Sequence, residues 1–177
     1  MSQEIVVITG APSSGKTTLI NELKEQGFYC FEEISRKITL EAQKKGIDQL
    51  FLKQPLLFSD RLLEGRLNQL LEAQKTEEKI VFLDRGIPDI IAYMDYVNAN
   101  YPYNYINSIK NNRYSKVFLL PPWKEIYTND QARYESYDEA EKIHLHLLET
   151  YQKYDYEIII VPTGTVSERV KFIHNHL

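Results

Sequence analysis

An α/β fold with a mainly parallel sheet and helices on both faces is predicted for this chain of 177 residues. Short apolar, β-branched runs alternate with amphipathic helical patterns, which is typical of parallel strands joined by crossover helices. A glycine-rich loop also joins the first run to the first helical pattern. We expect strands at residues 4–9, 28–31, 79–83, 116–120 and 157–161, and helices at residues 15–26, 32–45, 56–74, 88–98, 136–154 and after 165.

The first half of the chain carries clear local signals. Residues 4–9 (EIVVIT) are apolar and end at Gly10, which suits a central strand covered on both faces. Apolar residues at helical spacing follow, and Gly27 ends that helix. Residues 28–31 (FYCF) predict a second strand, and residues 56–74 form a long amphipathic pattern. This half therefore predicts two strands and three helices.

The second half continues the alternation. Residues 79–83 (KIVFL) form an apolar run, and Pro88 lies where proline is favoured, in the first turn of a helix. Two prolines stop the run at 116–120 (KVFLL). Capping boxes of the S/T-x-x-E type open the last two helices, at Ser136 and Glu139 and at Thr165 and Glu168.

Composition excludes several classes of protein. The net charge of −4 argues against a broad electrostatic surface for nucleic acid. Cys30 is the only cysteine, so no internal disulfide and no cysteine-based zinc site is expected. We find neither a signal peptide nor the roughly 20 apolar residues of a membrane span. We expect one cytoplasmic domain over residues 1–177, with no nucleic-acid partner and no membrane span; no pattern assigns an oligomeric state.

The loop between the first strand and the first helix matches G-x-x-x-x-G-K-[ST], the P-loop motif, in the structural context that the motif requires. Glycines let backbone N–H groups approach phosphate, and the helix N-terminus favours an anion. Lys16 can reach the β- and γ-phosphates, Thr17 can hold Mg²⁺, and Thr18 is placed near the α-phosphate. The predicted nucleotide-binding residues are Gly10, Ala11, Pro12, Ser13, Ser14, Gly15, Lys16, Thr17 and Thr18, with ATP or GTP and Mg²⁺ as ligands.

Asp84 and Arg85 follow the third strand, at the edge of a parallel sheet where ligands bind. Asp84 can hold Mg²⁺ through water or accept a proton from an acceptor hydroxyl; the alternative is a helix N-cap. Arg85 can clamp the acceptor or pair with an acid. Asp89, one turn later, is expected to be solvated or to serve the helix dipole.

Glu32 and Glu33 end the second strand at the same edge. Either can act as a general base, provided that it lies within hydrogen-bond reach of the attacking hydroxyl. The alternative is that both acids merely favour a helix N-terminus. Arg36 lies one turn further and is predicted to face the same cleft, so Glu32, Arg36 and Arg85 are the predicted acceptor-binding residues.

Two further segments are placed near the nucleotide. Residues 121–134 follow the fourth strand and are predicted to form a lid. Within the lid, Arg133 rather than Lys124 is predicted to contact the γ-phosphoryl group and to stabilise the charge that this group gains during transfer. Pro162 and Thr163, after the fifth strand, are placed to touch the base. The predicted catalytic residues are thus Lys16, Glu33, Asp84 and Arg133, and the predicted metal ligands are Thr17 and Asp84.

Several segments together resemble a known family. TGAPSSGKTTLI, FEEISR, FLDRGIPD, IAYMDY and LLPPWKEIYTNDQARYESYDEAEKIH resemble the NadR/Ttd-type AAA-like P-loop NTPase family, which is related to the ribosylnicotinamide kinase domain of NadR. The likeness runs from about residue 5 to residue 173. It implies a three-layer fold of the nucleoside- and nucleotide-kinase type, with five parallel strands in the order 2-3-1-4-5 and a short lid.

The resemblance also implies roles for the same residues. Lys16 and Thr17 would serve the nucleotide and Mg²⁺, Asp84 and Arg85 would lie in the acceptor cleft, and Arg133 would belong to the lid. The predicted function is ATP-dependent phosphoryl transfer to an unidentified small-molecule acceptor. The alternative is a regulatory switch that hydrolyses NTP without an acceptor. No guanine-specific N-K-x-D motif follows the fourth strand, which favours ATP over GTP.

Overall fold

The computed structural model describes residues 3–47, 50–127 and 135–177. Within them, five parallel strands form one sheet in the order β2-β3-β1-β4-β5. The predicted α/β class and the strand order are both confirmed. The strands are β1 (Glu4–Gly10), β2 (Tyr29–Phe31), β3 (Ile80–Asp84), β4 (Lys116–Leu120) and β5 (Ile158–Ile160).

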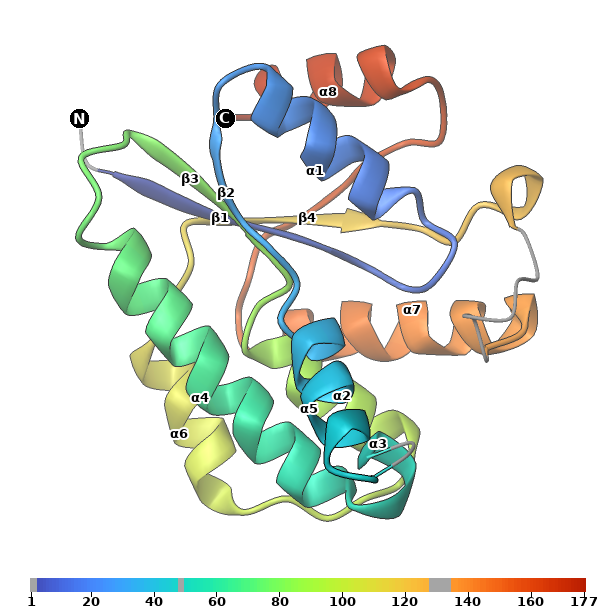
Figure 1. Cartoon of the computed structure of the whole chain (residues 1–177). Helices are drawn as coiled ribbons and strands as arrows, with labels where there is room; N and C mark the ends of the chain where they lie inside the picture. Colours follow the sequence, from blue (N-terminus) through green and yellow to red (C-terminus); the bar gives the residue numbers. More distant parts are fainter. Residues whose placement is uncertain (1–2, 48–49, 128–134) are drawn as a thin grey trace.

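Helices cover both faces of this sheet, which makes three layers (Figure 1). Helices α1 and α8 lie on one face, and α4, α5, α6 and α7 lie on the other. The helices are α1 (Lys16–Glu25), α2 (Ser35–Lys44), α3 (Leu50–Lys53), α4 (Pro55–Ala73), α5 (Pro88–Tyr96), α6 (Tyr103–Asn111), α7 (Tyr137–Lys153) and α8 (Val166–His174), with a 3₁₀ turn η1 (Lys124–Ile126).

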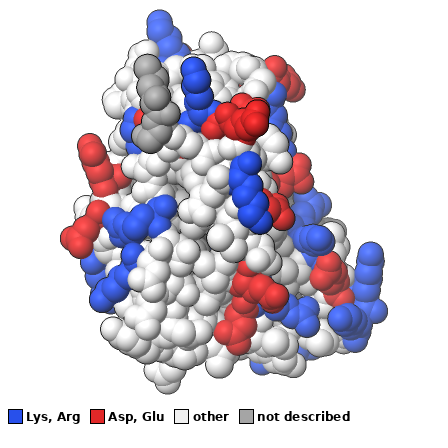
Figure 2. All heavy atoms as spheres, turned by 90° about the vertical axis from the view of Figure 1, so that its left-hand side faces the viewer, with Lys and Arg blue, Asp and Glu red and all other residues white. Residues whose placement is uncertain are grey.

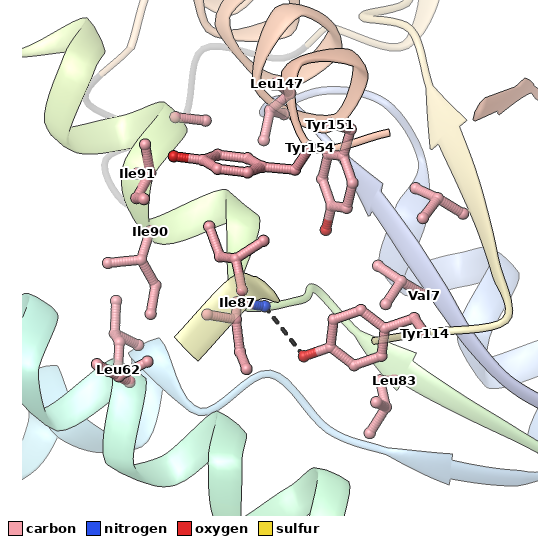
Figure 3. Close-up of a cluster of buried hydrophobic side chains, with 14 of the residues drawn as sticks. Val7, Leu62, Leu83, Ile87, Ile90, Ile91, Tyr114, Leu147, Tyr151 and Tyr154 are labelled. Carbon is pink, nitrogen blue, oxygen red and sulfur yellow. Dashed lines mark hydrogen bonds between the residues drawn. The ribbon is translucent and has the colours of Figure 1, made fainter. Parts of the chain in front are cut away.

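The central strand β1 divides the core into two parts. Val6 and Ile8 point to the face that α1 and α8 cover, whereas Ile5 and Val7 point to the opposite face. Figure 3 shows part of the second cluster, where Tyr151 from α7 and aliphatic side chains from α5 pack toward the sheet. Burial on both sides explains why the run at residues 4–9 is apolar without alternation.

Apart from small shifts at the ends of elements, the structure differs from the sequence-based expectation at the start of α2 and in two helices that were not predicted, α3 and α6. Helix α2 begins at Ser35 and not at residue 32, because the Glu33 carboxylate accepts a hydrogen bond of 3.1 Å from the Ser35 N–H. Helix α6 was not predicted at all. Only Tyr105 and Ile109 of its nine residues are buried, so its apolar face is too short to single out a helix in the sequence.

The register brings the chain's polar segments to one edge of the sheet. Ile8 pairs with Asp84, Gly10 pairs with Leu120, and Phe31 pairs with Leu83. The phosphate loop, the Asp84–Arg85 turn and the Glu32–Glu33 segment therefore all leave the sheet at its carboxyl edge, which is where open α/β sheets bind ligands.

The surface carries mixed charge. Figure 2 shows acidic and basic side chains interspersed over one face of the molecule, with no broad patch of a single sign there. This agrees with the small net charge of −4. None of the helices in the described part of the chain combines the length and the apolar character that crossing a bilayer requires.

Candidate active site at the carboxyl edge of the sheet

The phosphate loop joins β1 to α1 in a conformation that suits anion binding. Ser13 and Gly15 have positive φ angles of 62° and 73°, which turn the loop tightly. A Cβ atom on Gly10 would lie 2.7 Å from the carbonyl oxygen of Leu120, so only glycine fits there. The Trp123 N–H donates to the Ser13 carbonyl at 3.0 Å and fixes the loop to the segment after β4.

Gly15→Ala is expected to lower the free energy of unfolding by about 1–2 kcal/mol and to weaken nucleotide binding. The left-handed backbone alone accounts for that cost, and the new Cβ would lie 2.7 Å from Nη1 of Arg169. Gly46→Ala is the matched control, because Gly46 has a similar φ of 78° and no atom of the described residues lies within 4 Å of such a Cβ. Urea unfolding and calorimetric nucleotide titration measure both effects. Equal nucleotide affinity in the two variants would contradict this prediction.

Lys16 and Asp84 form a buried ion pair at the base of the loop. The Lys16 ammonium donates to Oδ1 of Asp84, and both side chains are less than a tenth exposed. Burial lowers the pKa of Lys16, with a further contribution from Arg85, and burial raises the pKa of Asp84. Asp84 ends β3 and does not cap α5, whose N-terminus has no side-chain cap. Asp84 therefore directs the ammonium of the phosphate loop.

Glu33 lies between two arginines. Its carboxylate pairs with Nε of Arg85 and lies 3.7 Å from Nη2 of Arg66. Burial raises the pKa of Glu33, but the charges of Arg85 and Arg66 outweigh that effect and hold the pKa at about 2. Glu33 is consequently ionised at neutral pH and can accept hydrogen bonds, although it is a weak base.

Asp89 corrects the expectation of a solvated side chain, because it is fully buried. Its carboxylate accepts hydrogen bonds from the Thr9 hydroxyl, the Gly86 N–H at 2.9 Å and the Tyr151 hydroxyl at 2.6 Å. It also pairs with Nη1 of Arg85 at 3.2 Å. Asp89 thereby holds the turn after β3, where Arg85 has a positive φ of 74°.

A cavity of about 370 Å³ opens beside these groups. Arg36, Arg66 and Arg85 line it, and Pro12 of the phosphate loop forms part of its wall. The remaining wall is largely apolar, with Phe58, Leu62, Ile90, Tyr93 and Met94 among its residues. This volume lies in the range of small-molecule sites, which combine apolar walls with a few polar groups. We call it the arginine-lined cavity.

The other predicted residues fall in different places. Glu32 is exposed and pairs with Lys24 at 2.7 Å, so it does not line the cavity. Pro162 and Thr163 are exposed in the loop after β5. Thr17 and Thr18 are exposed in the first turn of α1. Arg133 lies outside the residues that the structure describes.

Sequence reasoning missed Arg66, which is buried in the middle of α4. Its Nη1 donates to the Gly86 carbonyl at 2.6 Å, so it supports the same turn as Asp89 does. A signal was present, because Leu62, Arg66 and Leu70 follow one another at intervals of four. An arginine on the apolar stripe of a helix indicates a buried, partnered charge.

The donors near the loop fit Mg²⁺. This ion prefers oxygen ligands and takes most of them from water and substrate phosphates, with one or two from carboxylates. The Thr17 hydroxyl and the Asp84 carboxylate are donors of that type. Among the described residues, no three acidic, histidine or cysteine side chains gather into a metal cluster.

A family model described as an AAA domain matches residues 5–169. The chain belongs to this AAA-domain family. A nucleotide-binding protein of Alcanivorax borkumensis is 29% identical over 94 residues, which make up 46% of this chain and 32% of that protein. The chain thus spans about a third of that relative's length.

Solved structures resemble this AAA-domain chain over nearly its whole length. Deoxyadenosine kinase from M. mycoides, with dCMP and dCDP bound, has a TM-score of 0.69 at 20% identity and 97% coverage of each chain. NadR protein in complex with NR has a TM-score of 0.72 at 18% identity, covering 98% of this chain and 50% of NadR. The fold is therefore a kinase-like P-loop fold, and the predicted family resemblance is confirmed.

Proposed function

We propose that this chain is a Mg²⁺-dependent kinase that transfers the γ-phosphoryl group of ATP to a hydroxyl group of a small molecule. The observation that carries this proposal is the shared wall between the phosphate loop and the arginine-lined cavity, at Pro12. A second molecule bound there would lie next to the end of the phosphate chain. The kinases among the structural neighbours support the same reading.

Lys16 would neutralise the phosphoryl group as it is transferred, since such reactions depend mostly on positioning and charge compensation. Thr17 and, through water, Asp84 would hold Mg²⁺, which shields the charges of the phosphates. Arg85 and Arg66, which line the cavity, orient the Glu33 carboxylate. Glu33 would accept a hydrogen bond from the acceptor hydroxyl and align its oxygen for attack.

The cavity also indicates the kind of acceptor. Its arginines offer donors to polar groups, and its apolar wall suits a flat or aliphatic body. Incubation with γ-labelled ATP or GTP and pools of nucleosides, vitamins and sugars tests the proposal. Label in an organic product supports a kinase. Label found only in inorganic phosphate, across all pools, would exclude it and favour an NTP-hydrolysing switch.

Glu33→Gln is expected to lower kcat for transfer by about 10²-fold, because the acceptor hydroxyl loses the anionic hydrogen-bond acceptor that aligns its oxygen for attack. Nucleotide affinity should change less than kcat, since the ion pairs of Glu33 are made with the cavity arginines. Glu32→Gln is the matched control, because Glu32 is the exposed neighbouring carboxylate. Steady-state kinetics on the labelled product measure the effect. If both variants turn over equally, Glu33 has no part in the transfer.

A further inference from the structure

Arg169 stands out among the buried charges of the described chain. It lies in the second turn of α8, is only 3% exposed, and packs toward α1. Its Nε and Nη2 atoms are buried and have no hydrogen-bond partner in the described part of the chain. The guanidinium carbon lies 6.0 Å from the ring centre of Trp123. A cation–π contact of that length compensates only part of a buried charge.

The other buried arginines of the site are compensated. Arg66 donates to the Gly86 carbonyl and lies near Glu33, and only its Nε lacks a partner in the described part of the chain. Arg85 pairs with both Glu33 and Asp89. Burial lowers the pKa of Arg169, and no carboxylate in the described residues offsets that effect. Because an unpaired buried cation is costly, its retention calls for an anion that is not part of the described chain.

The position of Arg169 indicates which anion this is. A Cβ atom on Gly15 would lie 2.7 Å from Nη1 of Arg169, so the guanidinium lies against the phosphate loop itself. Cδ1 of Ile126 would lie 3.2 Å from the same Cβ atom, and the Trp123 N–H donates to the Ser13 carbonyl in the same loop. Helix α8, the phosphate loop and the segment after β4 therefore meet at this point.

We propose that Arg169 binds the phosphate chain of the nucleotide and supplies, from α8, a positive charge in addition to that of Lys16. This inference rests on the nucleotide binding of the proposed function. It does not depend on which acceptor the chain phosphorylates. Guanidinium groups suit this role, because they donate two parallel hydrogen bonds to phosphate oxygens.

Arg169→Met separates a ligand-binding role from a structural one. Methionine has a similar length and no charge, so the nucleotide-free variant should have a Tm equal to or above that of the wild type. Its Kd for ATP should rise at least about tenfold, as expected for the loss of a charge-assisted hydrogen bond. The Kd for adenosine should not change. Lys171→Met, on the exposed side of the same helix, should change neither value.

Calorimetric titration and thermal unfolding measure these effects. An ATP affinity of Arg169→Met within twofold of the wild-type value would overturn the inference while leaving the proposed function intact. A wild-type chain that binds no nucleotide would overturn both. A variant that binds ATP weakly but still transfers label supports the inference and the kinase together.

Trp123 provides a second test that needs no variant at position 169. It is the only tryptophan of the chain, so its emission reports on the surroundings of Arg169. Inorganic tripolyphosphate, which has no base, should change that emission in the wild-type protein. Adenosine, which has no phosphate, should leave it nearly unchanged. The opposite pattern would place the base against Arg169 and would overturn the assignment to the phosphate chain.

Discussion

Lys16→Ala is expected to lower phosphoryl transfer by about 10²–10³-fold, which is the cost of removing one preorganised charge from a developing anion. Lys16 is the buried ammonium of the phosphate loop, and Asp84 holds it in place. The substitution has a second consequence, because it leaves the Asp84 carboxylate buried without its partner. Removing one member of a buried ion pair costs about 3–5 kcal/mol of stability.

The combined variant Lys16→Ala with Asp84→Asn separates these two effects. It removes both charges, so much of the lost stability should return, whereas transfer should stay low. Initial rates of label transfer and urea unfolding of the single and combined variants form a double-mutant cycle. Transfer by Lys16→Ala within tenfold of the wild-type rate would contradict the proposed role of Lys16. Asp84→Asn alone should lose turnover while keeping much of its nucleotide binding.

The phosphate loop and the parallel sheet were predictable because their signals are local, whereas the order of the strands was implied by the family resemblance. The spacing of Gly10, Gly15 and Lys16 has meaning only between a strand and a helix, and both neighbours show their own patterns. Short apolar runs separated by helical patterns leave few arrangements other than a parallel sheet. These parts of the fold follow from residues that are close together in the sequence.

The acids and arginines around the cavity were only partly predictable, because their partners lie far away in the sequence. Asp89 has the pattern of an ordinary first-turn acid. It is nevertheless fully buried and accepts a hydrogen bond from the hydroxyl of Tyr151, 62 residues later. Arg66 meets Glu33 across the space between α4 and the end of β2. The spacing of residues along the sequence cannot predict such long-range pairs. It placed the acids at the correct edge of the sheet but could not assign their partners.

Asp89→Ala is expected to lower the free energy of unfolding by about 3–5 kcal/mol, as much as the loss of Lys16, because it removes a buried charge that has several partners. The carboxylate accepts from groups on three different parts of the fold: Thr9 on β1, Arg85 and Gly86 in the turn after β3, and Tyr151 on α7. Figure 3 shows the side chain of Tyr151 pointing from α7 toward the region of Ile87, next to this turn. Truncation would leave these donors buried and unpaired, and the desolvation of each donor would then lower the free energy of unfolding.

Asp95→Ala is the matched control, because Asp95 lies on the same helix but is only half-buried, and its carboxylate bonds to Tyr101. Its loss should cost about 1 kcal/mol. Urea unfolding at neutral pH measures both values, and equal losses would show that the Asp89 contacts contribute no special stability. Asp89→Asn should also slow transfer, since the neutral amide releases Arg85, which then holds Glu33 less firmly. A destabilised Asp89→Asn variant with unchanged kcat would instead confine Asp89 to the support of the fold.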